Sequence, residues 1–173
     1  MLIRAYGLLW NPDAVDWGSV GRGNRGSLLG KIRRDGSTHE IDFWDAHGVY
    51  VLLDQFRPIY IGQAGKGGLG PRLRDHLSDR FAGRWDMFSW FSMSTTNVTT
   101  SNVRAPGKRT LKPKTVLDTL EALGILLADP PLNRKRESVP DADLAEQSKS
   151  PHPKTVRHYL ETILKKLEDA ETP

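Results

Sequence analysis

Two tyrosines, an arginine and a histidine stand close together in the segment GVYVLLDQFRPIYIGQAGKGGLGPRLRDHL. Tyr50 and Tyr60 each lie in a short apolar run, and Arg72 and His76 follow, four residues apart. Arginine stabilises negative charge through its guanidinium fork, and histidine exchanges a proton near neutral pH. The segment is therefore a candidate catalytic surface, unless these side chains serve only the packing of an ordinary domain.

Each of these residues also has a purely structural interpretation, which the sequence leaves open. The two tyrosines could be edge aromatics that pack a sheet. Arg72 could pair with Asp75 or Asp79, because both would lie on its own helix. A histidine on a helix surface is often only solvent-exposed, so His76 needs a partner before it can be assigned a role.

Glu121 stands in a different setting, a predicted helix over residues 115–128 that is apolar on almost every side. Such a pattern predicts a buried helix. A carboxylate there is unfavourable unless it is paired or bound to a metal. Two interpretations remain: a salt bridge to an arginine, or a ligand of Mg²⁺ or Mn²⁺, which prefer oxygen ligands.

The elements that must position the two tyrosines are two predicted strands, residues 48–53 and 58–62. If the turn between them centres on Gln55, Tyr50 lies directly opposite Tyr60 in an antiparallel pair. Residues that face each other across such a pair project to the same side of the sheet. A change of one residue in this register would separate the two rings.

A helix is expected to begin at Gly70-Pro71, since proline is tolerated in the first turn. Its buried stripe recurs at every fourth residue, at Leu73, Leu77 and Phe81. Arg72 and His76 are one turn apart on a neighbouring face of that helix. The glycine loop before it, residues 62–70, lacks the ending of a phosphate-binding P-loop.

The rest of the chain predicts an α+β fold with a small, mostly antiparallel central sheet flanked by helices. Asp35-Gly36 between two strand-like runs indicates a hairpin over residues 27–44. Further elements are expected as strands at 2–10 and 87–93, loops at 11–26 and 94–102, and an amphipathic helix at 152–168. We divide the chain into an N-terminal β extension packed on the core (1–45), a core (46–134), a linker (135–150) and a C-terminal helix (151–173).

Five features occur in one order: GVY at 48–50, YIG at 60–62, Arg72 with His76 on a helix, Glu121 on a later helix, and Asn133 in PLN. This arrangement resembles the GIY-YIG nuclease family over about residues 48–134, with Val49 in place of isoleucine. The resemblance implies a β-β-α-β-α core. Asn133 could also be no more than a turn residue after Pro131.

The resemblance implies a divalent-metal-dependent DNA endonuclease that leaves 5′-phosphate and 3′-hydroxyl ends. By position, Tyr50 and Tyr60 would flank the site and Arg72 would contact the scissile phosphate. Glu121 would hold the cofactor, Mg²⁺ or Mn²⁺, and Asn133 would order the site or contact the substrate. Because a phenol is a weak base at pH 7, Tyr50 would need help from His76 or the metal to take a proton. The sequence does not decide whether Tyr50 or His76 accepts it.

Basic residues cluster around these motifs in a chain whose formal net charge is +4. Contacts between such basic residues and phosphates make nucleic-acid binding salt-dependent. A cluster of charged residues can also be no more than a solvent-exposed face. Residues expected to contact nucleic acid are Lys66, Arg74, Arg84, Arg104, Lys108, Arg109, Lys112 and Lys114. The expected partner is DNA, with RNA left open, and the C-terminal helix could join a second copy or another protein.

The amino-acid composition and the apolar runs bear on cysteine-dependent sites and on membrane segments. The chain has no cysteine, which excludes disulfides and thiolate zinc sites. It has no apolar run of the roughly 20 residues that a membrane span needs, and its first residues lack a signal-peptide layout. We expect a cytoplasmic protein. The alternative function is a catalytically inactive module that binds nucleic acid or assembles into a larger defence or repair complex.

Overall fold

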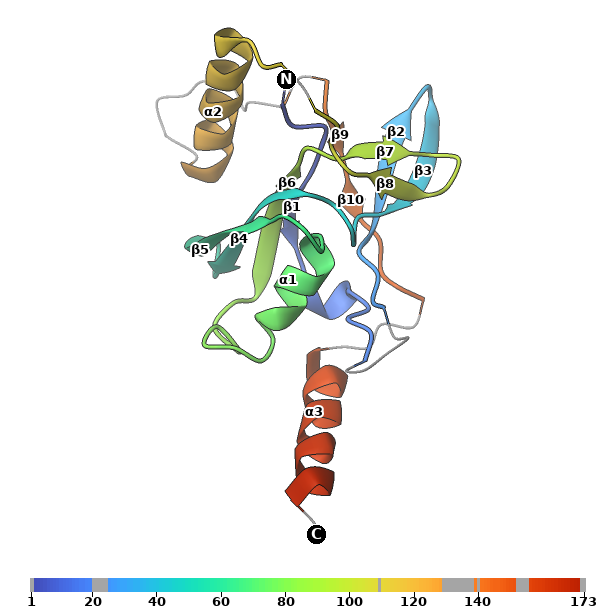
Figure 1. The fold of residues 1–173 in the computed structure, drawn as a ribbon, viewed down its shortest axis with the longest axis vertical. Coiled ribbons are helices and arrows are strands. Elements are labelled where there is room, and N and C mark those ends of the chain that lie inside the picture. The colour runs from blue at the N-terminus through green and yellow to red at the C-terminus, as the bar shows by residue number, and fades with distance from the viewer. Residues whose placement is uncertain are drawn as a thin grey trace.

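The computed structural model describes residues 2–19, 25–108, 110–128, 139, 141–151 and 156–171. Within them the chain forms an α+β fold with two mixed sheets of five strands each and three α-helices (Figure 1). The strands are β1 Ala5–Trp10, β2 Leu29–Arg34, β3 Ser37–Asp42, β4 Gly48–Asp54, β5 Arg57–Ala64, β6 Met87–Ser92, β7 Thr95–Asn97, β8 Asn102–Arg104, β9 Asp143–Leu144 and β10 Glu146–Gln147. The helices are α1 Leu69–Asp75, α2 Pro113–Ala128 and α3 Val156–Glu171, with a 3₁₀ turn at Pro12–Ala14.

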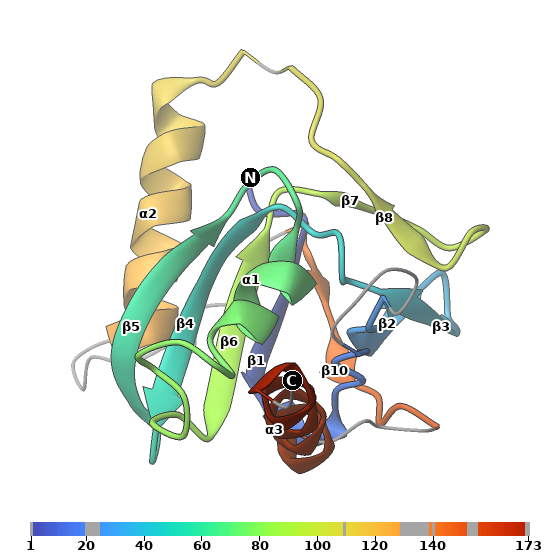
Figure 2. The same cartoon turned by 60° about the horizontal axis from the view of Figure 1, so that its bottom comes forward.

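The first sheet has the strand order β5-β4-β6-β1-β9. Its first four strands pair antiparallel, and β9 runs parallel to β1. Helix α1 covers one face of this sheet and α2 lies on the other (Figure 2). Side chains alternate between these faces along each strand, so Tyr50 packs with the α1 side while Val49 faces α2.

The second sheet has the order β10-β2-β3-β8-β7. Its β2–β3 hairpin turns at Asp35 and Gly36, which both have positive φ, 51° and 76°. This is the two-residue turn that the sequence predicts. Large aromatic side chains fill the core cluster between the sheets with edge-to-face and tilted contacts, among them Trp10, Phe43, Phe88 and Trp90.

The pairing of β4 with β5 differs from the prediction by two residues. Tyr50 pairs with Gly62, and Tyr60 pairs with Leu52. The turn is the pair Gln55 and Phe56, both at positive φ. Leu52 faces Tyr60 while Leu53 faces Pro58, so one extra residue bulges out of β5. A shift of two keeps the side-chain alternation, so the two tyrosines still share one face.

Three segments enter the sheets more fully than predicted. Strand β1 lies inside the first sheet between β6 and β9, so the N-terminal residues belong to the central sheet. In the expected linker, β9 pairs with β1 and β10 pairs with β2. Asp143 accepts hydrogen bonds from Arg34 and Thr96, at 2.5 and 2.6 Å. The segment 94–102, predicted as a loop, contains β7.

Helix α2 is much more exposed than its apolar sequence predicts. Only Thr119 and Ala122 are buried, while Leu117 and Leu120 are 66% and 61% exposed. Leu123 and its neighbours at 126 and 127 pack against Ile3, Tyr6 and Phe91 on the sheet. One side of the helix therefore contacts the fold, and the prediction of a buried helix is wrong.

None of the helices in the described part of the chain has both the length and the apolarity needed to cross a membrane.

Candidate active site

A chain of three hydrogen-bonded side chains connects β4 to the end of α1. The hydroxyl of Tyr50 lies 2.7 Å from Nε2 of His76, and Nδ1 of His76 lies 2.6 Å from a carboxylate oxygen of Asp79. Tyr50 is fully buried, His76 is 2% exposed, and the side chain of Asp79 is 37% exposed. The chain therefore leads from the interior to the surface.

Strand β4 holds Tyr50 firmly because it is flanked by β5 and β6. The residue opposite is Gly62 of the YIG motif. A Cβ at that position would overlap Cζ and Oη of the Tyr50 ring. Gly48 of the GVY motif is similar, since a Cβ there would overlap the carbonyl oxygen of Phe91. Both motif glycines are thus required by close approach.

Helix α1 places His76 at its C-terminal end. Leu69 and Leu73 are buried, which anchors the helix against the sheet, and Leu77 is buried just beyond its end. His76 is the residue that caps α1, and the chain continues in turns through Asp79. The backbone N–H of Phe81 donates to Asp79, which holds the carboxylate in place beside the imidazole.

The electrostatic surroundings keep Tyr50 protonated and Asp79 ionised. Burial raises the pKa of Tyr50 to about 12; nearby Tyr60 adds to the shift and the charge of Arg72 opposes it. Burial acts to raise the pKa of Asp79, but the hydrogen bonds from Phe81 and His76 and the charge of Arg80 together lower it.

An ionised Asp79 accepts a hydrogen bond from Nδ1–H of His76, which leaves Nε2 as an acceptor for the Tyr50 hydroxyl. The arrangement can therefore move a proton from Tyr50 to His76, with Asp79 stabilising the imidazolium that forms. With its own pKa raised, Tyr50 is a poor base in this arrangement. In this geometry Nε2 of His76 is the group that can accept the Tyr50 proton.

The raised pKa of Tyr50 has a consequence for stability at alkaline pH. The folded state binds this proton more tightly than the unfolded state, where the pKa is near 10. The stabilisation is present below pH 10 and is lost as the pH rises toward 12, up to about 3 kcal/mol. We expect the free energy of unfolding, measured with urea between pH 9 and 12, to fall more in the native chain than in Tyr50→Phe. Equal slopes would contradict the assignment.

Tyr60, Phe81 and Arg72 form the outer layer of the site. The rings of Tyr60 and Phe81 lie 5.3 and 5.2 Å from the His76 ring, between centroids, and are only partly buried. Arg72 is 44% exposed and pairs with Asp75 at 3.4 Å. Its guanidinium is thus weakly held next to Tyr50, where it can meet an anion from solvent.

The structure brings together four of the predicted site residues: Tyr50, Tyr60, Arg72 and His76. It does not bring Glu121 to them. Glu121 is exposed on α2, across the sheet from Tyr50. The residues at the tyrosine cluster therefore do not fit the expected cation site, because its expected ligand lies on the other face. Asn133 and Arg109 lie outside the described residues.

Most of the residues expected to contact nucleic acid are exposed, as that role requires. Arg74 is the exception. Its guanidinium lies 5.5 Å from the centre of the Trp44 ring, and the residue is partly buried. The exposed ones are Lys66, Arg84, Arg104, Lys108, Lys112 and Lys114. Trp85 and Trp90 are both in the core and take no part in a surface.

Asp79 and Phe81 are the residues that sequence reasoning did not assign to the site. The spacing of three residues from His76 to Asp79 is a usable signal, since side chains at this spacing meet on the helix that the sequence predicts here. The sequence offers Asp79 as a possible partner for Arg72, but Arg72 pairs with Asp75. The sequence predicts Phe81 only as a buried residue of the helix stripe.

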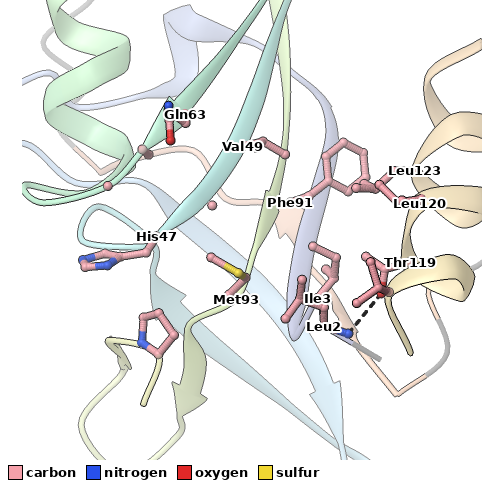
Figure 3. Close-up of a pocket in the computed structure, with 15 residues that line it drawn as sticks. Leu2, Ile3, His47, Val49, Gln63, Phe91, Met93, Thr119, Leu120 and Leu123 are labelled. Carbon is pink, nitrogen blue, oxygen red and sulfur yellow. Dashed lines mark hydrogen bonds between the residues drawn. The ribbon is translucent and has the colours of Figure 1, made fainter. Parts of the chain in front are cut away.

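An apolar cavity of about 290 Å³ lies on the opposite face of the sheet, between the sheet and α2 (Figure 3). Its walls include Ile3, Val49, Phe91 and Leu123, and His47 and Gln63 also line it. None of the four clustered site residues lines this cavity. It is therefore separate from the Tyr50–His76–Asp79 chain.

Comparison with protein-family models, with curated proteins and with solved structures gives no match to this chain.

Proposed function

We propose that this protein is an endonuclease that hydrolyses phosphodiester bonds of DNA and leaves 5′-phosphate and 3′-hydroxyl ends. The observation that carries the proposal is the hydrogen-bonded chain Tyr50–His76–Asp79 next to the exposed Arg72. Hydrolysis of a phosphodiester needs removal of a proton from the attacking water and stabilisation of charge on the phosphoryl oxygens. The site offers a group for each task.

In the proposed reaction His76 takes the proton that the attacking water loses, relayed through the Tyr50 hydroxyl. Asp79 stabilises the imidazolium through Nδ1. Arg72 contacts the scissile phosphate and exchanges its weak pairing with Asp75 for a charge-assisted bond to the phosphate. Tyr60 and Phe81 must shift to admit the substrate, because Tyr50 is fully buried beneath this outer layer.

The dependence on Mg²⁺ or Mn²⁺ enters the proposal from the family resemblance. Glu121 would be the ligand, and the cation would supply charge stabilisation when bound. Since Glu121 lies across the sheet from Tyr50, we derive no step through the cation.

A second candidate function is a catalytically inactive module that binds nucleic acid. Two observations favour it: Glu121 is on the other face of the sheet, and the Tyr50 hydroxyl has no exposure to solvent. In that case Tyr50, His76 and Asp79 form a satisfied polar network that stabilises the fold. The exposed basic residues would then act by binding alone.

A cleavage assay separates the two functions. We expect the purified protein to cut plasmid DNA with Mg²⁺ or Mn²⁺ and not with EDTA, and to produce the expected ends. Arg72→Ala is expected to slow cutting by about 10²- to 10³-fold, the effect of losing one donor to a developing charge. Arg33→Ala, an exposed arginine on β2, is the matched control and should cut normally.

Glu121→Gln tests the metal role in the same assay. If Glu121 holds the cation, the variant loses cutting while DNA binding is retained; Glu146→Gln, an exposed carboxylate on β10, is the control. If Glu121→Gln cuts DNA at the native rate, Glu121 takes no part in the reaction. The substrates to test are single-stranded, duplex and branched DNA, and RNA. If the protein binds them but cuts none under any metal condition, the proposed nuclease activity is wrong and the inactive binding module is supported.

A further inference from the structure

Helix α3 has more apolar surface than the domain covers. Tyr159 is 7% exposed, and Val156 and Ile163 pack against the main core. Leu160, Leu164 and Leu167 are instead 36%, 58% and 57% exposed. The helix leads away from the two sheets toward the C-terminus (Figure 1). It therefore contacts the domain with one side and shows a second apolar side to solvent.

The exposed leucines form a continuous stripe. Spacings of four and three residues place Leu160, Leu164 and Leu167 on one face of an α-helix. Helix pairs bury this kind of stripe against each other. A stripe of large aliphatic side chains on a projecting helix marks an interaction surface.

The charges beside the stripe indicate what covers it. Arg157, Glu161, Lys165 and Glu168 lie on one flank of the leucines, and Tyr159 and Ile163 lie on the other. Two copies of α3 packed antiparallel about a twofold axis bring their charged flanks together. Arg157 of each copy then lies next to Glu168 of the other, and Glu161 next to Lys165.

We propose that the leucine stripe of α3 binds a second copy of this chain as an antiparallel helix pair. In that arrangement Leu160 of one copy packs on Leu167 of the other, and Leu164 packs near the twofold axis. All four ionic contacts are attractive. The Arg157–Glu161 pair within each helix, at 2.8 Å, stays compatible with them.

A parallel pair is disfavoured by the way α3 joins the domain. A parallel twofold would press the charged flank of one helix against the Tyr159 and Ile163 flank of the other. That flank is already packed on the core of its own domain. In the antiparallel arrangement the charged flank of one helix instead meets the charged flank of the other, with opposite charges at each contact.

The dimer is expected to be weak, because two helices of 16 residues bury less than the roughly 1,200 Å² of a standard stable interface. We therefore expect a micromolar dissociation constant, seen in sedimentation velocity as a shift from monomer to dimer between about 1 and 500 µM. The proposal does not depend on nuclease activity, and the assay uses the full chain.

The decisive variants alter the stripe and its charges. Leu164→Lys should leave a monomer at every concentration, while the matched control Leu117→Lys, a similarly exposed leucine on α2, should dimerise normally. Arg157→Glu should weaken the dimer about tenfold, the effect of reversing two exposed ion pairs. Adding Glu168→Arg to Arg157→Glu should restore it. Circular dichroism checks that α3 stays helical in each variant.

Orientation can be tested by cross-linking, since the native chain has no cysteine. We expect Arg157→Cys mixed with Glu168→Cys to form a disulfide between the two variants, in preference to pairs of one variant with itself. Ready self-pairing of Leu160→Cys, which faces Leu167 in the antiparallel arrangement, would indicate a parallel dimer and overturn the proposed arrangement. A monomer across the whole concentration range, or a dimer unaffected by Leu164→Lys, would overturn the use of this surface altogether.

Discussion

Replacing His76 with alanine is expected to slow DNA cleavage by about 10²- to 10⁴-fold at pH 7, the usual contribution of a general base. The reason is geometric. Nε2 of His76 lies 2.7 Å from the Tyr50 hydroxyl, and the pKa of Tyr50, about 12, makes the tyrosine ineffective as a base by itself. Single-turnover cleavage rates measure the effect. Tyr50→Phe should slow cleavage to a similar extent, and the double variant should be little worse than either single one, because both act on one proton transfer.

Asp79→Asn tests the remaining member of the chain by a measurement that does not depend on cleavage. The native carboxylate accepts from Nδ1–H of His76 and so selects the tautomer with a free Nε2. We expect ¹⁵N NMR to report this tautomer in the native chain and a mixture in Asp79→Asn. If the NMR signals of His76 are the same in both proteins, Asp79 does not orient the imidazole. If the tautomer changes in Asp79→Asn but the native protein has no nuclease activity, the hydrogen bond from His76 to Asp79 is supported and only the proposed reaction is wrong.

Gly62→Ala is expected to destabilise the fold by about 1–3 kcal/mol, the range for overpacking a filled interior. The added methyl group would overlap the Tyr50 ring at Cζ and Oη and lie 2.8 Å from Cε1 of Tyr60. Tyr50 has no room to retreat because it is fully buried. The variant should therefore lose the hydrogen bond from Tyr50 to His76 together with stability. Urea unfolding measures the loss of stability, and the cleavage rate reports the loss of the hydrogen bond.

Gly65→Ala is the matched control for this experiment. It lies just beyond the same strand, and a Cβ there has no atom within 4 Å. Its effect on the free energy of unfolding should stay within about 0.5 kcal/mol, as for most surface substitutions. Combining Gly62→Ala with Tyr50→Phe should recover part of the lost stability, since the overlapping hydroxyl is gone. Equal stability of the Gly62 and Gly65 variants would contradict the close packing of the motif glycine on the tyrosine.

Residue types and their spacing in the sequence determined the strands and the helix that hold the tyrosine cluster, and which side chains belong to that cluster. Asp35-Gly36 predicts its hairpin because few residue pairs adopt two consecutive positive φ angles easily. Leu73 predicts the buried side of α1 because helical spacing leaves few alternatives, but α1 ends at Asp75, so the predicted helix is too long and Leu77 and Phe81 lie beyond it. Tyr50 and Tyr60 share a face because side chains alternate along a strand, and this survives a register shift of two residues.

Only the tertiary structure decided the relations that depend on long-range packing. The bulge in β5 sets the true register, and neither the turn sequence nor the apolar pattern specifies it. The apolar residues of α2 predict burial but not which face of the sheet the helix covers, so the sequence could not place Glu121 relative to Tyr50. The choice of Asp79 as partner of His76, and of Asp75 as partner of Arg72, depends on how the chain turns after α1. Spacing restricts which side chains can meet, and packing selects among the pairs that remain.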